Sequence, residues 1–194
     1  MRILLAVPTF EHIQNDVFEA IYAMDKCGHD IDFKYVPGHD CARARNIIAD
    51  MAVGGGYDYV MMVDSDTVIP KDALKNLLDP ATDIVLGVCP RKNTKKKETA
   101  LCPITHPDLK KSLTYDELGT ERIELIVGGF ACALIRTEVF YDLMYPYFKY
   151  ETHDDRSVLS EDYYFCEKAY ASGFQIWADP RVKCGHLTKF YQYE

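Results

Sequence analysis

The first 90 residues alternate between short apolar runs and longer amphipathic stretches, and this alternation limits the fold more than any other feature. Each apolar run has the length of a strand that is buried on both faces. Strands are expected at 3–7, 31–36, 58–63 and 83–88. Helices are expected between them, near 13–26, 42–53 and 70–78. Strands separated by helices form βαβ units, so a parallel sheet is predicted.

The pattern changes after Pro90. Residues 91–122 are polar, contain two prolines and show no sustained apolar period, which is typical of a mobile loop or lid. The strand-like runs "IELIV", "ACALI" and "QIWA" follow, with helices expected near 137–144 and 160–171. We therefore predict one α/β domain over 1–194, with a mostly parallel central sheet, helices on both faces and a mixed C-terminal half.

Composition excludes several classes of protein. The chain has 194 residues, of which 48% are hydrophobic and 27% charged, as in an ordinary globular domain. A net charge of −8 argues against non-specific binding to nucleic acid. The apolar stretch before Pro8 is too short for a signal peptide or membrane span. Seven cysteines without a CxxC pair fit buried thiols in a reducing compartment, so a cytoplasmic location is expected.

The stretch "VMMVDSDTVIP" places two aspartates, Asp64 and Asp66, directly after an expected buried strand. Ligands bind at the carboxyl ends of parallel strands, and two close carboxylates repel each other unless a cation or proton lies between them. A divalent metal ion is one interpretation. The other is a polar turn in which Asp64, Ser65 and Asp66 cap the helix expected near Pro70.

Two further stretches allow both a functional and a structural interpretation. Arg43, Arg45 and Asn46 begin the second expected helix, where they could hold a diphosphate or a base, or could simply be exposed. Gly128 and Gly129 stand between two expected strands, where they either let the backbone approach a ligand or form a β-bulge.

Acidic and metal-binding residue types also occur near the C-terminus. Glu161 and Asp162 open the last helix, where the helix dipole favours acids in any case. Successive helical residues point about 100° apart, so at most one of them faces a site. Cys184 and His186 share one face of an extended segment, and His186 is either a metal ligand or a satisfied polar residue.

Taken in order, these stretches resemble the GT-A fold, and in particular the large family-two class of nucleotide-sugar glycosyltransferases. The matching stretches are "VPTFEH", "ARN", "VDSD" as a DxD motif, "GGFACALIRTEVF", "SEDYYFCEKAYASGF" and "CGH". No single motif is specific, but together they cover most of the chain in the order that the family requires.

The resemblance implies a nucleotide-binding half at 1–90, a mobile loop at 91–122 and an acceptor and catalytic half at 123–194. It implies a Mn²⁺ or Mg²⁺ ion bound by Asp64, Asp66 and His186, which would bridge the phosphates of a nucleotide-sugar donor such as a UDP-sugar. Glu161 and Asp162 would be the catalytic acids, with Asp162 as the base of an inverting transfer to a glycan, lipid-linked or protein acceptor. The residues assigned to donor binding are Pro8, Thr9, Phe10, Glu11, Arg45, Asp64, Ser65, Gly128 and Gly129.

Some positions depart from the family pattern. Many members carry an acidic, glycine-rich turn after the second strand, and this chain has "VPGHDC" there, so Asp40 is expected to take over the contact with the base. Arg91 or Lys95, Lys96 and Lys97 would reach the phosphates when the loop closes.

Two other functions fit parts of the sequence. "DSDTV" also matches the motif of haloacid-dehalogenase-like phosphatases, with Asp64 as nucleophile and "HDDRS" as an acidic pair. "YPYFKY", 145–150, could stack on sugar rings in a non-catalytic carbohydrate-binding module.

Overall fold

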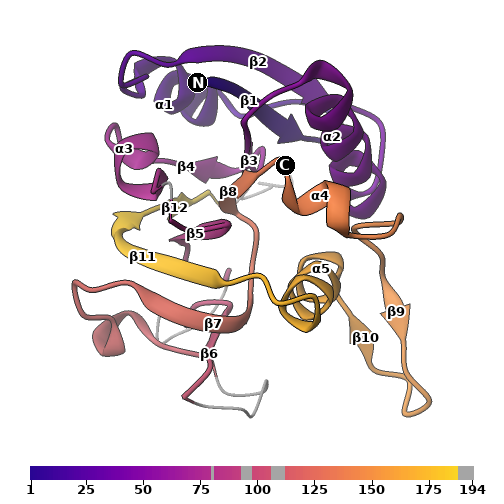
Figure 1. The fold of residues 1–194 in the computed structure, drawn as a ribbon. Coiled ribbons are helices and arrows are strands. Elements are labelled where there is room, and N and C mark those ends of the chain that lie inside the picture. Colours follow the sequence, from indigo (N-terminus) through magenta and orange to yellow (C-terminus); the bar gives the residue numbers. More distant parts are fainter. Residues whose placement is uncertain (80, 93–97, 106–111, 188–194) are drawn as a thin grey trace, which may run out of the picture.

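The computed structural model describes residues 1–79, 81–92, 98–105 and 112–187 (Figure 1). Within this part of the chain an eight-stranded sheet has the order β2-β1-β3-β8-β5-β11-β7-β6. Its strands are β1 (Arg2–Pro8), β2 (Asp30–Val36), β3 (Tyr59–Val63), β5 (Ile84–Val88), β6 (Leu101–Pro103), β7 (Ile123–Gly128), β8 (Cys132–Arg136) and β11 (Ile176–Lys183).

Strand direction in this sheet is mixed. β1 pairs in parallel with β2 and β3, and β5 pairs in parallel with β11. Among the strands of the described sheet, β8 and β7 run against their neighbours, so the remaining strands share one direction. The predicted α/β fold is confirmed, with one difference: β3 and β5 are not adjacent, because β8 lies between them.

Helices cover both faces of the sheet (Figure 1). The described helices are α1 (Asn15–Ala23), α2 (Cys41–Gly55), α3 (Ala73–Leu77), α4 (Val139–Asp142) and α5 (Glu161–Ala171). Alternate residues of β1 enter different cores: Leu4 and Ala6 pack with residues of α2 and α5, and Leu5 packs with residues of α1 and α3. Both faces of the strand are therefore apolar, which is why its sequence shows no alternation.

Several short elements were not predicted. β4 (Thr67–Val68) pairs with β12 (Gly185–His186), and β9 (Glu151–Thr152) pairs with β10 (Val158–Leu159) in a hairpin that projects from the domain (Figure 1). Such strands of two residues are too short to leave a periodic pattern.

The expected loop 91–122 is partly structured. It contributes β6, whose Leu101 and Cys102 are buried in the core, and a 3₁₀ turn, η1 (Tyr115–Glu117). The described part is thus more ordered than the prediction of a continuous loop. Lys95, Lys96 and Lys97, which were expected to reach phosphates, lie outside the described residues.

No helix in the described ranges combines the length and the apolar character that a membrane crossing requires.

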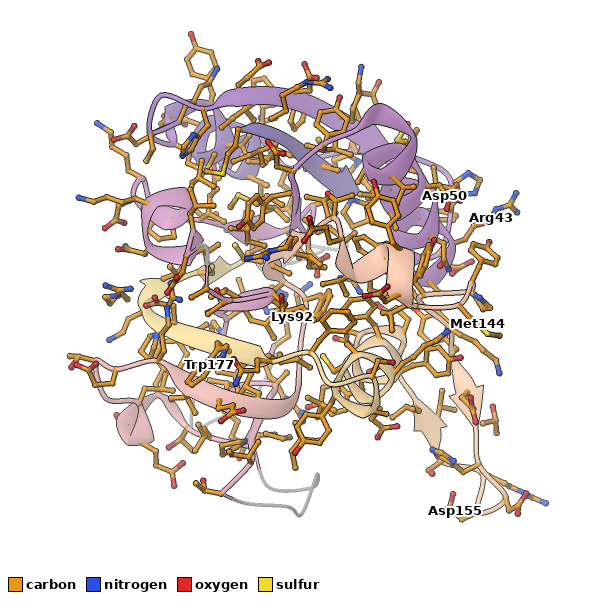
Figure 2. The ribbon with its side chains drawn as sticks, viewed as in Figure 1. Arg43, Asp50, Lys92, Met144, Asp155 and Trp177 are labelled. Carbon is orange, nitrogen blue, oxygen red and sulfur yellow. The ribbon has the colours of Figure 1, made fainter. Side chains whose placement is uncertain are left out.

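Asn46 ties helix α2 to the chain that follows α4. Its side-chain amide donates to Phe148 O at 2.7 Å and to Ala42 O at 2.9 Å, and its Oδ1 accepts from the backbone N–H groups of Tyr147 and Phe148 at 2.9 and 3.1 Å. Asn46 is buried, so its "ARN" position serves the packing of the domain and not a ligand. Arg43, by contrast, lies at the outer side of α2 (Figure 2).

Replacing Asn46 with Ala should lower the free energy of unfolding by about 3 kcal/mol, because buried backbone groups of residues 147 and 148 lose their partners. Asp50→Ala is the matched control, one turn later on the exposed face of α2 (Figure 2), and should change stability by less than about 0.5 kcal/mol. Urea unfolding measures both variants. Equal stabilities would contradict the anchoring role of Asn46.

Candidate active site

The DxD aspartates lie in a turn that joins β3 to β4. Asp64 N donates to Ala131 O at 2.9 Å, and Thr67 N donates to Asp64 O at 3.0 Å, which closes the turn. Helix α3 begins later, at Ala73, and its N-cap is Asp72. The interpretation that Asp64, Ser65 and Asp66 cap this helix is therefore wrong.

The pairing of β4 with β12 brings the C-terminal histidine to the turn. His186 is in register with Thr67, and Leu187 N donates to Asp66 O at 2.9 Å. As a result His186 Nε2 lies 3.5 Å from Asp66 Oδ1. The residues 66 and 186, which are 120 positions apart in the sequence, are thus neighbours, as the resemblance implied.

Arg45 is a buried cation between two carboxylates. Its side chain is 2% exposed, its Nη2 donates to Asp64 Oδ1 at 2.7 Å, and its Nη1 forms an ion pair with Glu161. Burial raises the pKa of both Asp64 and Glu161, and the charge of Arg45 opposes the rise. Arg45 therefore lies in the core, not in an exposed first turn, and it orients the two acids.

Asp66 has both carboxylate oxygens engaged. Oδ2 forms an ion pair with Lys92, and Oδ1 faces His186. Burial raises the pKa of Asp66, but hydrogen bonds from His186 and Lys92 outweigh it and lower the pKa to about 2. The hydrogen bond to Asp66, with a second one to Cys89, raises the pKa of His186 to about 10.

The predicted metal ligands are only partly gathered. Across the described ranges, no three His, Cys, Asp or Glu side chains converge as a metal-binding group, because Asp64 is directed toward Arg45. The residue types nevertheless fit the ion: carboxylate oxygens and one imidazole suit Mn²⁺ or Mg²⁺. His186 Nδ1 lies 2.7 Å from Pro90 O, an arrangement that leaves Nε2 facing Asp66, as is usual for a histidine that binds a metal.

A cavity of about 160 Å³ separates the DxD turn from helix α5. Its lining includes Asp64, His186, Asp162, Gly129 and Phe130. Asp162 Oδ1 accepts hydrogen bonds from the Ser160 hydroxyl and from Tyr163 N, and its Oδ2 lies 3.4 Å from Phe130 N. Asp162 thus faces the cavity while its neighbour Glu161 points to Arg45.

Positions 128 and 129 require glycine, because neighbouring side chains lie too close for a Cβ atom. A Cβ atom on Gly128 would lie 2.4 Å from Leu86 Cδ1, and one on Gly129 would lie 2.8 Å from Ala100 Cβ. Gly129 also lines the cavity, whereas Gly128 is packed against side chains of the core. The register shift nearby leaves Ile126 of β7 as the extra residue, because Cys102 and Pro103 pair with Val127 and Leu125. The irregularity therefore lies before the two glycines and not at them.

A second cavity, of about 370 Å³, holds most residues that were assigned to the nucleotide. Its predicted members are Pro8, Thr9, Phe10, Asp40, Asp64, Ser65 and Asp66. Asp40 is also the N-cap of α2, since its carboxylate accepts from Arg43 N at 3.0 Å. Glu11 is exposed and is not part of the lining. The two cavities share Asp64.

Sequence reasoning missed several lining residues, namely His39 and Cys41 of the larger cavity and Gly87, Cys89 and Ala100 of the smaller one. Gly87 had a usable signal, since a glycine within an apolar strand often marks close approach. A Cβ there would lie 3.0 to 3.2 Å from Val182, Cys132 and Cys184.

The other predicted features lie elsewhere. In "YPYFKY", Tyr147 is 9% and Phe148 1% exposed, and Phe148 stacks on Phe165 with ring centroids 4.6 Å apart, so these two residues form core and not a sugar platform. Tyr150, at the end of the stretch, is exposed and lines the larger cavity. Asp154 and Asp155, the acidic pair of the phosphatase hypothesis, lie between β9 and β10. Figure 2 shows Asp155 at the tip of this hairpin, far from Lys92.

Comparisons with known proteins identify the family and the fold. Residues 20–144 match the model of the family described as "Glycosyl transferase family 2". No curated protein sequence matches the chain.

Solved structures of similar fold include three with low sequence identity. A197 from STIV is 18% identical with a TM-score of 0.65, over 97% of this chain and 87% of that one. GalNAc-T7, whose structure contains UDP, GalNAc and Mn²⁺, is 12% identical with a TM-score of 0.65, over 97% and 44%. TarS from S. aureus is 17% identical with a TM-score of 0.57, over 96% and 60%. The likeness shows a shared GT-A fold, and the chain spans less than two thirds of the last two structures.

Replacing Arg45 with Met should lower the free energy of unfolding by about 3 to 5 kcal/mol, because Asp64 and Glu161 lose their buried cation. Adding Glu161→Gln to this variant should restore part of the loss, since it removes one of the unpaired charges. Arg43→Met, an exposed arginine on the same helix, is the control. Chemical denaturation would contradict the network if the single and double variants were equally stable.

Proposed function

The chain belongs to glycosyl transferase family 2, and we propose that it transfers a hexose from a UDP-sugar to an acceptor hydroxyl with inversion at the anomeric carbon. The observation that carries this proposal is the position of Asp162 across a cavity from the DxD turn. The family match favours this activity over the phosphatase and the carbohydrate-binding alternatives.

The larger cavity is our proposed site for the nucleotide. Phe10 and Tyr150 offer aromatic surface for a base, and Asp40 and Thr9 offer polar atoms near it. Because this cavity meets the smaller one at Asp64, a donor could lie with its nucleotide in the first and its sugar in the second. Gly129 leaves room for the sugar, since any side chain there would occupy the cavity or contact Ala100.

Asp66, His186 and Asp64 are the residues that would hold Mn²⁺ or Mg²⁺. A bound divalent cation would neutralise the charge that develops on the departing diphosphate. Arg45 acts indirectly, because it fixes the orientation of Asp64 from the core.

Asp162 is the proposed general base. Inversion by a single displacement requires a carboxylate on the acceptor side to take the hydroxyl proton as the sugar is transferred. Hydrogen bonds from Ser160 and from the backbone of Tyr163 and Phe130 hold the carboxylate in one orientation. Glu161 is not suited to this task, because its carboxylate is paired with Arg45.

The acceptor and the cellular compartment complete the proposal. We propose a glycan, lipid-linked or protein acceptor that enters past the described part of 91–122 and the β9–β10 hairpin, with loop closure over the donor. All seven cysteines are free thiols, which supports a cytoplasmic location.

UDP together with Mn²⁺ should raise the melting temperature of the parent protein, because both ligands bind the folded state. Asp66→Asn should abolish the shift while leaving the unliganded melting temperature within a few degrees, since Asp66 is only partly buried. Asp72→Asn, an exposed carboxylate in the same region, is the control and should retain the shift. A thermal-shift experiment that finds the parent and Asp66→Asn equally stabilised would contradict the metal site.

Asp162→Asn should slow hydrolysis of the UDP-sugar, with water as acceptor, by about a hundredfold or more, as expected for loss of a positioned base. UDP affinity should stay unchanged, because Asp162 lines the smaller cavity and not the larger one that is proposed for the nucleotide. Glu167→Gln removes a charge from the same helix and is the control. NMR of the first sugar released should show the inverted anomer, and retention of the donor's configuration would overturn the mechanism.

A further inference from the structure

Lys92 supplies a positive charge directly to the DxD motif. Its ammonium group forms an ion pair with Oδ2 of Asp66, the residue expected to bind the metal directly. Asp66 therefore has a cationic partner from its own chain, besides His186 at Oδ1.

Hydrogen bonds fix the backbone of the two residues that precede Lys92. Pro90 O is held by His186 Nδ1 at 2.7 Å, and Arg91 N donates to Glu98 O at 2.7 Å. Cys184 N donates to Val88 O at 2.8 Å, which joins the end of β5 to the strand that leads to His186. The contacts that place His186 therefore also place Lys92 next to Asp66.

Arg45 and Lys92, which are paired with the two DxD aspartates, differ in how easily their ion pairs can dissociate. Arg45 is buried and is bound to both Asp64 and Glu161, so its departure would leave two acids without a partner. The Lys92 side chain, by contrast, is 40% exposed. An ion pair of this exposure contributes little and can be exchanged for water or another cation.

We propose that Lys92 is a positioning residue that acts as a displaceable internal cation: it holds Asp66 and competes with the divalent metal ion for this carboxylate. This inference rests on the proposed metal-dependent function. The diphosphate of the donor offers the displaced ammonium a new partner, since lysine binds phosphate as a point charge. Metal binding and diphosphate binding are therefore coupled through Lys92, and each strengthens the other.

The test measures the affinity for Mn²⁺ without nucleotide, by electron paramagnetic resonance of the free ion. Lys92→Met should bind Mn²⁺ about three- to tenfold more tightly than the parent protein, because the competing cation is gone. Lys71→Met is the control, because it removes the same charge from an exposed side chain shortly after β4. It reports the general effect of charge and should change the affinity by less than about twofold.

The same titration with saturating UDP measures the coupling. UDP should tighten Mn²⁺ binding in the parent and in Lys71→Met by a larger factor than in Lys92→Met, which has lost the residue that links the two ligands. Equal Mn²⁺ affinities of Lys92→Met and Lys71→Met would overturn the role of Lys92 and leave the metal site standing. Absence of Mn²⁺ binding by the parent, even with UDP, would overturn the metal site and the role of Lys92 together.

Discussion

The buried ion network of Arg45 determines how the two halves of the site are held together. Arg45 comes from α2, Asp64 follows β3, and Glu161 begins α5, so one guanidinium joins three elements that are distant in sequence. A charge in the core is stable only when opposite charges lie close to it, and Asp64 and Glu161 supply them to Arg45. The distance between the DxD turn and the first turn of α5, which sets the width of the cavity between them, therefore depends on this contact.

The same fold gives the two DxD carboxylates different electrostatic surroundings. Asp64 is paired with a cation that is sealed in the core, whereas Asp66 is paired with His186 and the half-exposed Lys92. An incoming divalent cation meets less resistance at Asp66, because the partner that it displaces can move into solvent. This difference explains why Asp66, rather than Asp64, is the better candidate for direct contact with a metal ion.

The sequence predicted the elements that are buried on both faces and failed where long-range pairing decides the structure. The apolar runs of β1, β3 and β5 were recognisable, but the insertion of β8 between β3 and β5 depends on contacts far apart in the chain. The burial of Arg45 had a signal that was overlooked: Ala42, Ala49 and Ala52 lie on its face of α2 at spacings of three and four, and all are buried. Lys92 had none, since it belongs to a basic run that composition alone assigns to solvent.

The site uses each of its two acidic pairs in the same way. In Asp64 and Asp66, and again in Glu161 and Asp162, the first acid is bound by Arg45 and the second is left for other contacts. Four carboxylates close together would repel one another, and Arg45 offsets the charge of Asp64 and Glu161. For α5 this division follows from helix geometry, because neighbouring residues point about 100° apart and cannot both face Arg45. The helical register that directs Glu161 into the core is thus what turns Asp162 toward the cavity.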